Sequence, residues 1–172
     1  MKAKTTKKVL VSVVMGSDSD LPIMSEATKI LEKFKVSYEI ILTSVHRAPA
    51  RTTKFSQEAQ SRGVQIIIAG AGAAAHLAGI IASHTALPVI GVPIDATSLK
   101  GLDALLATVQ MPGGIPVATM SIGKAGAKNA ALFAVRMLAL SDKTLHEKLA
   151  AYVNKMATDI EKKQELLVCP KS

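Results

Sequence analysis

Short apolar runs rich in β-branched residues alternate along this sequence with segments of helical periodicity. The first run, Val9–Met15, is hydrophobic at almost every position, which is typical of a strand covered on both faces in a parallel sheet. We predict further strands at Tyr38–Leu42, Val64–Ala69, Pro88–Val92 and Val117–Ile122, and helices at Leu21–Phe34, Pro49–Arg62, Ala74–His84, Leu102–Val109 and Ala125–Leu140. Such a strict alternation indicates an α/β sheet with helices on both faces.

This element order, with right-handed crossovers, predicts a flavodoxin-like three-layer sandwich whose five-stranded parallel sheet has the order 2-1-3-4-5. The chain has 172 residues, 49% of them apolar, which is enough for one domain with its own core. No internal repeat or low-complexity linker divides it. We therefore predict a single domain over residues 1–172, with a basic tail (1–8), a core (9–140) and an extra C-terminal helix (141–169).

The predicted C-terminal helix carries an apolar stripe that the core does not need. A sheet already covered on both faces leaves little free core, so we expect the stripe to dock on a neighbouring subunit of a homo-oligomer. Its residues are Leu145, Leu149, Val153, Met156, Ile160 and Leu167.

A net charge of +8 can indicate a protein that binds nucleic acid, but the positions of the basic residues argue against this interpretation. Four of the basic residues, Lys2, Lys4, Lys7 and Lys8, lie in the N-terminal tail, which we interpret as a solvated terminus. With three Phe, two Tyr and no Trp, the chain is poor in the aromatic platforms on which single-stranded nucleic acid stacks. We expect no nucleic-acid partner.

Secreted and membrane proteins are also disfavoured. The single cysteine, Cys169, excludes a disulfide scaffold and a cysteine-rich zinc site. The segment 63–94 has no Asp, Glu, Lys or Arg, but Gln65, His76, His84 and several glycines and prolines interrupt it, so it does not read as a membrane span. The tail lacks the apolar region of a secretory signal. We predict a cytoplasmic protein without a membrane partner.

Candidate functional groups gather in the loops after the first three strands. In an open α/β sheet, ligands bind beyond the carboxyl ends of the strands, where the strand order reverses. The loops predicted to meet there are Gly16–Asp20, Thr43–Arg47 and Gly70–His76. They are rich in groups that handle anions, hydroxyls and protons, so we expect the site at this edge of the sheet.

The first of these loops is suited to a sugar phosphate. Serine hydroxyls and backbone N–H groups at a helix N-terminus bind phosphate, with Asp20 as the expected N-cap of the helix that follows. Asp18 or Asp20 would repel a phosphate, so at least one of them should face sugar hydroxyls. A receiver domain also has acidic residues here, but it needs a phosphoacceptor Asp where this chain has Gly70 and Ala71, and that alternative fails.

The second loop places His46 beside Arg47, just before a helix that begins near Pro49. The planar guanidinium of Arg47 suits phosphate, and imidazole is the natural proton carrier near neutral pH. An ordinary surface His–Arg pair remains the alternative at this point.

The third loop matches G-x-G-x-x-[GA] and is followed by Asp95, as in a dinucleotide fingerprint. That motif belongs in the first βαβ unit of a longer protein, so we favour small residues that allow close approach of a ligand and of the helix. His76 is expected in the first turn of that helix, lining the site. A further segment, Gln110–Val117, contains two prolines and two glycines and reads either as a tight connection or as a wall that keeps water out of a cavity.

Four segments together resemble the PurE family of purine biosynthesis, in the right order and at the right spacings: Val14–Asp20, Ser44–Pro49, Gly70–Leu77 and Val109–Val117. The resemblance implies the same five-stranded α/β core and a homo-octamer in which the C-terminal helix packs across subunits. Ala73 stands where glycine is usual in the family and Ala78 where proline is usual, and Val45 and Ala48 flank His46–Arg47; these are small changes that leave every polar group present.

The PurE family has two classes. Class I members are mutases that convert 5-(carboxyamino)imidazole ribonucleotide to 4-carboxy-5-aminoimidazole ribonucleotide, and class II members carboxylate aminoimidazole ribonucleotide with carbon dioxide. The run from Gln110 to Thr119 resembles class I. The class II carboxylase and, less favoured, a non-catalytic nucleotide-binding regulator remain alternatives.

The resemblance also implies the site residues. His46 is the proton carrier, and Ser17, Asp20 and Arg47 bind the ribonucleotide, with Asp20 facing the ribose. Ser19 and Ser44 lie near the phosphate. The remaining predicted contacts are Gly16, Asp18, Ala71, Gly72, His76, Met111, Pro112 and Gly113. No cofactor and no metal ion is expected, since metal-ligand spacings do not appear in the sequence.

Overall fold

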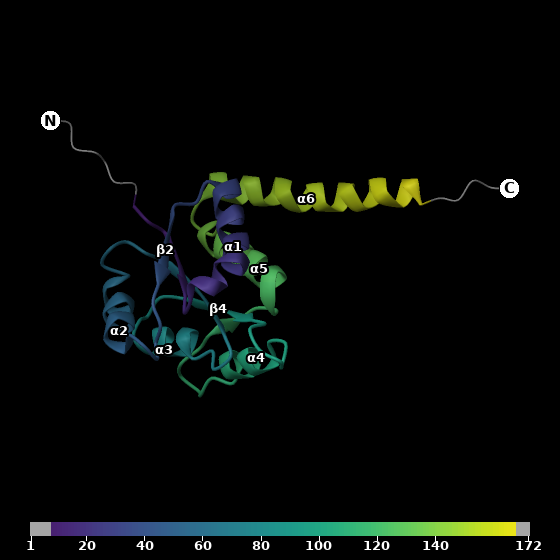
Figure 1. The fold of residues 1–172 in the computed structure, drawn as a ribbon. Coiled ribbons are helices and arrows are strands. Elements are labelled where there is room, and N and C mark those ends of the chain that lie inside the picture. The colour runs from purple at the N-terminus through teal and green to yellow at the C-terminus, as the bar shows by residue number, and fades with distance from the viewer. Residues whose placement is uncertain (1–7, 168–172) are drawn as a thin grey trace. The chain divides into compact units, whose positions relative to one another are not determined.

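The structure, a computed structural model, describes residues 8–167. It confirms the predicted alternation of strands and helices (Figure 1). The strands are β1 (Val11–Met15), β2 (Tyr38–Leu42), β3 (Ile66–Gly72), β4 (Val89–Ile94) and β5 (Ala118–Thr119). The helices are the 3₁₀ turn η1 (Asp18–Asp20), α1 (Leu21–Phe34), α2 (Pro49–Glu58), α3 (Leu77–Ser83), α4 (Leu102–Val109), α5 (Gly123–Leu138) and α6 (Lys143–Leu166).

The sheet has the predicted strand order, β2-β1-β3-β4-β5, and every neighbouring pair is parallel. Val14 of β1 is in register with Ile41 of β2 on one side and Ala69 of β3 on the other. The chain order reverses at β1, because β2 lies on one side of it and β3 on the other. Loops that leave the carboxyl ends of β1 and β3 therefore diverge and leave a crevice between them.

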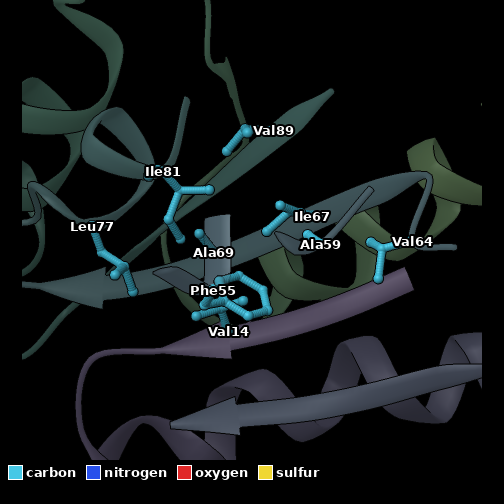
Figure 2. Packing of buried hydrophobic residues seen from close by; sticks show 10 residues of the cluster. Val14, Phe55, Ala59, Val64, Ile67, Ala69, Leu77, Ile81 and Val89 are labelled. Atoms are coloured by element: carbon cyan, nitrogen blue, oxygen red, sulfur yellow. The ribbon is translucent and has the colours of Figure 1, made fainter. Parts of the chain in front are cut away.

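Helices cover both faces of this sheet. Figure 1 shows α2, α3 and α4 on one side, while α1 and the start of α5 lie on the other. On the first side, buried strand residues pack against Phe55 of α2, Ala59 directly after that helix, and Leu77 and Ile81 of α3 (Figure 2). The strand residues of this cluster are Val14, Ile67, Ala69 and Val89. Each large side chain that is buried here contributes about 1.5–3 kcal/mol of transfer free energy.

The structure corrects several predicted boundaries around the site. β3 continues to Gly72, beyond the predicted end at Ala69, because Gly70, Ala71 and Gly72 still pair with β4. A Cβ atom on Gly70 would lie 2.2 Å from Met24 Sδ. Glycine at this strand position therefore leaves room for the Met24 side chain of α1. α3 begins at Leu77, so His76 precedes the helix and does not lie in its first turn.

Three other elements are shorter than predicted, and the first of them is β1, which begins at Val11 and not at Val9. α2 ends at Glu58, before the predicted Arg62, and β5 has only two residues. Hydrogen bonds of Arg62 and Gly63 to Glu58 and Gln60 continue the chain as turns after the helix.

The chain divides into two compact units, and the division falls within α5, between Ala134 and Val135. α6 begins after Asp142, whose carboxylate accepts a hydrogen bond of 2.9 Å from the Leu145 backbone N–H. The predicted single domain and the predicted docking of α6 stay predictions. The first seven residues, with most of the basic tail, and Cys169 lie outside the described residues. Within residues 8–167, no helix is both long and apolar enough to cross a membrane.

Candidate active site

A cleft of about 380 Å³ opens at the carboxyl edge of the sheet, where the strand order reverses. It is formed by the segments that follow β1, β2, β3 and β4. Its lining residues are Gly16, Ser17, Ser19, Asp20, Ser44, Val45, His46, Arg47, Ala71, Gly72, Ala73, Ala74, Leu77 and Ala96. The structure therefore brings nine of the predicted site residues together: Gly16, Ser17, Ser19, Asp20, Ser44, His46, Arg47, Ala71 and Gly72.

The loop after β1 is braced by its own side chains. Asp20 Oδ2 accepts a hydrogen bond of 3.1 Å from the Ser17 backbone N–H, and Ser17 Oγ accepts one of 3.4 Å from the Ser19 N–H. The hydroxyl of Ser19 lies 2.8 Å from that of Ser17, which in turn donates to Asp18 Oδ1 at 3.2 Å. Asp18 does not line the cleft, but it holds the two serines that do.

Asp20 is the N-cap residue of α1, as predicted, but its side chain does not cap that helix. It makes no side-chain capping bond to α1; its carboxylate turns back and completes a capping box with Ser17 across η1. The side chain is buried, with the residue only 5% exposed. Burial raises the pKa of Asp20, and the nearby charge of Asp18 raises it further, while hydrogen bonds from the backbone of Ser17 and Gly16 work in the opposite direction.

Arg47 connects the loops that follow β1 and β2. Its Nη2 donates to the carbonyl oxygen of Gly16 at 3.1 Å, and its Nε donates to Ser44 Oγ at 3.4 Å. Ser44 Oγ also accepts the backbone N–H of Arg47 at 3.3 Å. The guanidinium is thus held beside the serine-rich turn, with its remaining N–H donors available to an anion in the cleft.

His46 contacts a second histidine. Its Nε2 atom lies 3.0 Å from Nδ1 of His76, and the two rings meet edge-on, with centroids 5.1 Å apart and an angle of 81° between the planes. One of these two nitrogens must carry the shared hydrogen, so the tautomer of each ring depends on the other. The sequence predicts that both residues belong to the site, but it does not predict this contact, because 30 positions separate them.

The segment after β3 forms one wall of the cleft with small residues. Ala73 has a left-handed backbone, with φ of 53°, and its carbonyl accepts the Ala75 N–H at 2.8 Å. A Cβ atom on Gly72 would lie 2.5 Å from the Cβ of Ala96, so glycine allows β3 to approach the segment after β4. Five further residues line the cleft that were not among the predicted site residues: Val45, Ala73, Ala74, Leu77 and Ala96. Ala96 could have been predicted to line the cleft, because it follows the strand predicted at Pro88–Val92.

Met111 and Pro112 lie at a second cavity of about 300 Å³. Its lining residues are His76, Gly79, Ile80, Ser83, Ala107, Met111, Pro112 and Ile115. Gly113 lines neither of these two cavities. His76 borders the second cavity and does not line the first cleft, contrary to the prediction, but it contacts His46 there. A substrate contact by residues 111–113 stays a prediction.

Known proteins resemble this chain along nearly its whole length. N5-carboxyaminoimidazole ribonucleotide mutase of Pyrococcus horikoshii is 54% identical over 162 residues, which cover 94% of this chain and 90% of that protein. Phosphoribosylaminoimidazole carboxylase of Candida glabrata is 47% identical over 163 residues; these cover 95% of this chain, which spans only 28% of that longer protein. The crystal structure of Treponema denticola PurE matches with a TM-score of 0.84 and 27% identity, over 93% of this chain and 99% of that one.

A family model described as AIR carboxylase matches residues 10–159, which include every element from β1 to α5 and most of α6. The matched range contains all the residues that line the cleft. The chain belongs to the AIR carboxylase family.

Proposed function

We propose that this protein is an N5-carboxyaminoimidazole ribonucleotide mutase of purine biosynthesis. The observation that carries this function is the 54% identity to a mutase along 90% of that protein's length. The cleft supports this proposal, since the imidazole of His46 lines it together with the hydrogen-bond donors of Ser17, Ser19 and Arg47. The enzyme moves a carboxyl group from the exocyclic nitrogen to ring carbon C4 of the same ribonucleotide.

In this proposal the first two loops bind the ribose phosphate. The hydroxyls of Ser17, Ser19 and Ser44 and the guanidinium of Arg47 form the phosphate site, because they supply neutral donors and one positive charge. The buried carboxylate of Asp20 faces the ribose, and its oxygens can accept hydrogen bonds from the ribose hydroxyls. A cleft of about 380 Å³ is within the range that small-molecule sites occupy.

His46 carries one proton through the reaction. When the N–CO₂ bond breaks, its electron pair stays on the nitrogen, and His46 delivers a proton to that nitrogen as carbon dioxide leaves. Ring carbon C4 then attacks the carbon dioxide, and the proton on C4 returns to His46. The sum is an isomerisation with no net proton uptake. The contact between His46 and His76 holds the His46 ring in place while the proton moves.

Carbon dioxide must stay in the site between the two steps. A site closed to water serves this purpose, because it keeps the released molecule beside C4 and away from hydration. The wall of small residues after β3 and the uncharged segment Gln110–Val117 are the parts of the chain that we assign to this task.

We further propose that the enzyme is a cytoplasmic homo-octamer in which α6 packs on a neighbouring subunit of single-domain protomers. Apolar side chains of α6 support this assembly: Val153, Met156 and Ile160 are 38%, 44% and 65% exposed in the single chain. Contiguous apolar surface of this kind marks interaction sites in proteins.

The carboxylase name of the Candida glabrata relative favours a second candidate, direct carboxylation of aminoimidazole ribonucleotide. An ultraviolet assay on the purified protein separates the two functions. We expect fast conversion of the carboxyamino ribonucleotide and slow reaction of aminoimidazole ribonucleotide with bicarbonate. The reverse preference would identify a carboxylase, and no reaction with either would leave a nucleotide-binding protein.

A further inference from the structure

His46 and Arg47 lie on the connection between β2 and α2, residues 43–48, where both side chains are exposed. The catalytic geometry therefore depends on how this connection is fastened to the rest of the fold. On one side, the partly buried Val45 packs against the core cluster that Figure 2 shows. At its start, the Thr43 backbone N–H donates to the Met15 carbonyl of β1 at 3.0 Å.

The side chain of Thr52 holds both ends of the connection. Thr52 lies in α2 and is fully buried. Its Oγ1 is 3.3 Å from the carbonyl oxygen of Ala48 and 2.9 Å from Oγ1 of Thr43, which is also buried. A carbonyl oxygen can only accept, so the Thr52 hydroxyl donates to Ala48. Its oxygen then accepts the hydroxyl hydrogen of Thr43.

The contact with Thr43 distinguishes this hydroxyl from others in the fold. Threonine in a helix often donates to the carbonyl four residues earlier, and Thr108 does so to Ala104 at 2.7 Å in α4. At Thr52, the bond from Thr43 also joins the hydroxyl to the far end of the loop. Between the two bonded residues lie Ser44, His46 and Arg47, whose polar groups line the cleft.

We infer that Thr52 is a positioning residue for the mutase reaction: it touches no substrate, and it acts through the ends of the 43–48 connection on His46 and Arg47. This inference rests on the proposed function. A displacement of the connection would move the His46 ring away from both the substrate and His76. Enzymatic rates are sensitive to errors of about 1 Å in the position of a reacting group.

The test is Thr52→Val, which keeps the shape of the side chain and removes both hydrogen bonds. We expect kcat to fall by about 10-fold or more, within the range that misplacement of a catalytic group produces. Thr52→Ser, which keeps the hydroxyl, should restore kcat to near the wild-type value. Thr108→Val is the matched control, because it removes a hydroxyl that is also buried and the same type of helical bond away from the cleft. Its kcat should stay close to wild type.

Hydrogen exchange of the 43–48 amides gives a readout that does not depend on activity. Exchange should become faster in Thr52→Val and stay unchanged in Thr108→Val. If the wild-type protein proves not to be a mutase, the proposed function fails, while this comparison still tests the fastening of the connection.

Unchanged kinetics and unchanged exchange in Thr52→Val would overturn the inference. So would an equal loss of kcat in Thr108→Val, or a failure of Thr52→Ser to recover it, since either result would assign the effect to general stability or to the methyl group. If Thr52→Val does not fold, Thr43→Val removes the bond between the ends with less disturbance of α2. Folded Thr43→Val with wild-type kcat and exchange would also overturn it.

Discussion

At the scale of single residues, the proposed mechanism divides the work in the cleft between a proton carrier and an anion-binding group. In this proposal His46 carries the proton, and no other imidazole lines the cleft among the residues that the structure describes. We expect His46→Asn to fold and to bind ribonucleotide while kcat falls by about 100-fold or more, the usual contribution of general acid–base catalysis. Steady-state kinetics with a separate binding measurement checks this, and near-wild-type turnover would contradict the proton-carrier role.

Arg47 is expected to act mainly on binding. Its guanidinium is already oriented by Gly16 and Ser44, so its loss would remove the phosphate contact that we propose. A hydrogen bond to a charged group contributes about 1.5–3 kcal/mol, so Arg47→Ala should raise KM by about 10-fold or more with a smaller change in kcat. Arg51→Ala, an exposed arginine of α2 outside the cleft, is the control. A KM equal to wild type would refute the phosphate contact.

Ala73 is a non-glycine residue that the fold holds in the left-handed region, with φ of 53°. Glycine adopts this conformation without the Cβ clash that an alanine suffers, at a cost in unfolded-chain entropy. We expect Ala73→Gly to raise the free energy of unfolding by up to about 1 kcal/mol. Ala74→Gly, at an exposed neighbour without a positive φ, should lower it, and denaturant titration of both variants measures the difference. Equal destabilisation by both changes would show that Ala73 bears no strain.

At the scale of elements, a charged network joins β1, β2 and the turn that follows α2. Arg62 donates two hydrogen bonds, of 2.8 and 2.9 Å, to the carboxylate of Glu39, which also accepts the hydroxyl of Ser12 at 2.7 Å. The Arg62 guanidinium lies 5.4 Å from the ring centre of Phe55. Partial burial acts to raise the pKa of Glu39, but the hydrogen bonds from Arg62 and Ser12 and the charge of Arg62 prevail, so its pKa lies below the usual value.

This lowered pKa predicts a pH-dependent stability. The unfolded state binds the proton more readily, so the contribution of Glu39 is complete above the unfolded pKa, about 4.3, and is lost as the pH falls through the lower folded value. We expect Glu39→Gln to cost about 1 kcal/mol at pH 7 and little in strong acid. Glu58→Gln, which loses only an exposed contact of 3.9 Å to Lys54, should cost almost nothing. A cost for Glu39→Gln that does not change between pH 7 and pH 3 would contradict this linkage.

The elements also show how far the sequence predicts this molecule. Apolar runs and helical periodicity predict the strand order and the loops that form the cleft, because both are local patterns combined with general rules of chain connection. These local patterns fail at Gly70. A glycine at this position predicts the end of the strand, but Gly70 pairs with β4 and packs against Met24, so it lies inside β3. The His46–His76 contact and the turn of Asp20 toward Ser17 were equally hidden, since they depend on how separate loops and a 3₁₀ turn are placed in space.

At the scale of the whole molecule, the proposed assembly of subunits depends on the exposed apolar face of α6. The apolar side chains of Val153, Met156 and Ile160 recur on α6 at spacings of three and four, so they share one face of that helix. Exposed faces of this kind cost free energy in water unless a partner covers them. With the octamer that we propose, light scattering should give the wild-type protein the mass of eight subunits.

Two charges on that face should break the assembly. Met156→Glu combined with Ile160→Glu places carboxylates where an apolar contact is proposed, and burying them without partners is costly. We expect a smaller species with unchanged helix content by circular dichroism. Lys162→Glu is the control, because helical spacing places residue 162 on the opposite face of α6. If the double variant keeps the wild-type mass, the subunits associate through another surface. If Lys162→Glu also dissociates the protein, net charge and not the apolar face governs assembly. Either of these two results would show that the contact proposed for α6 is wrong.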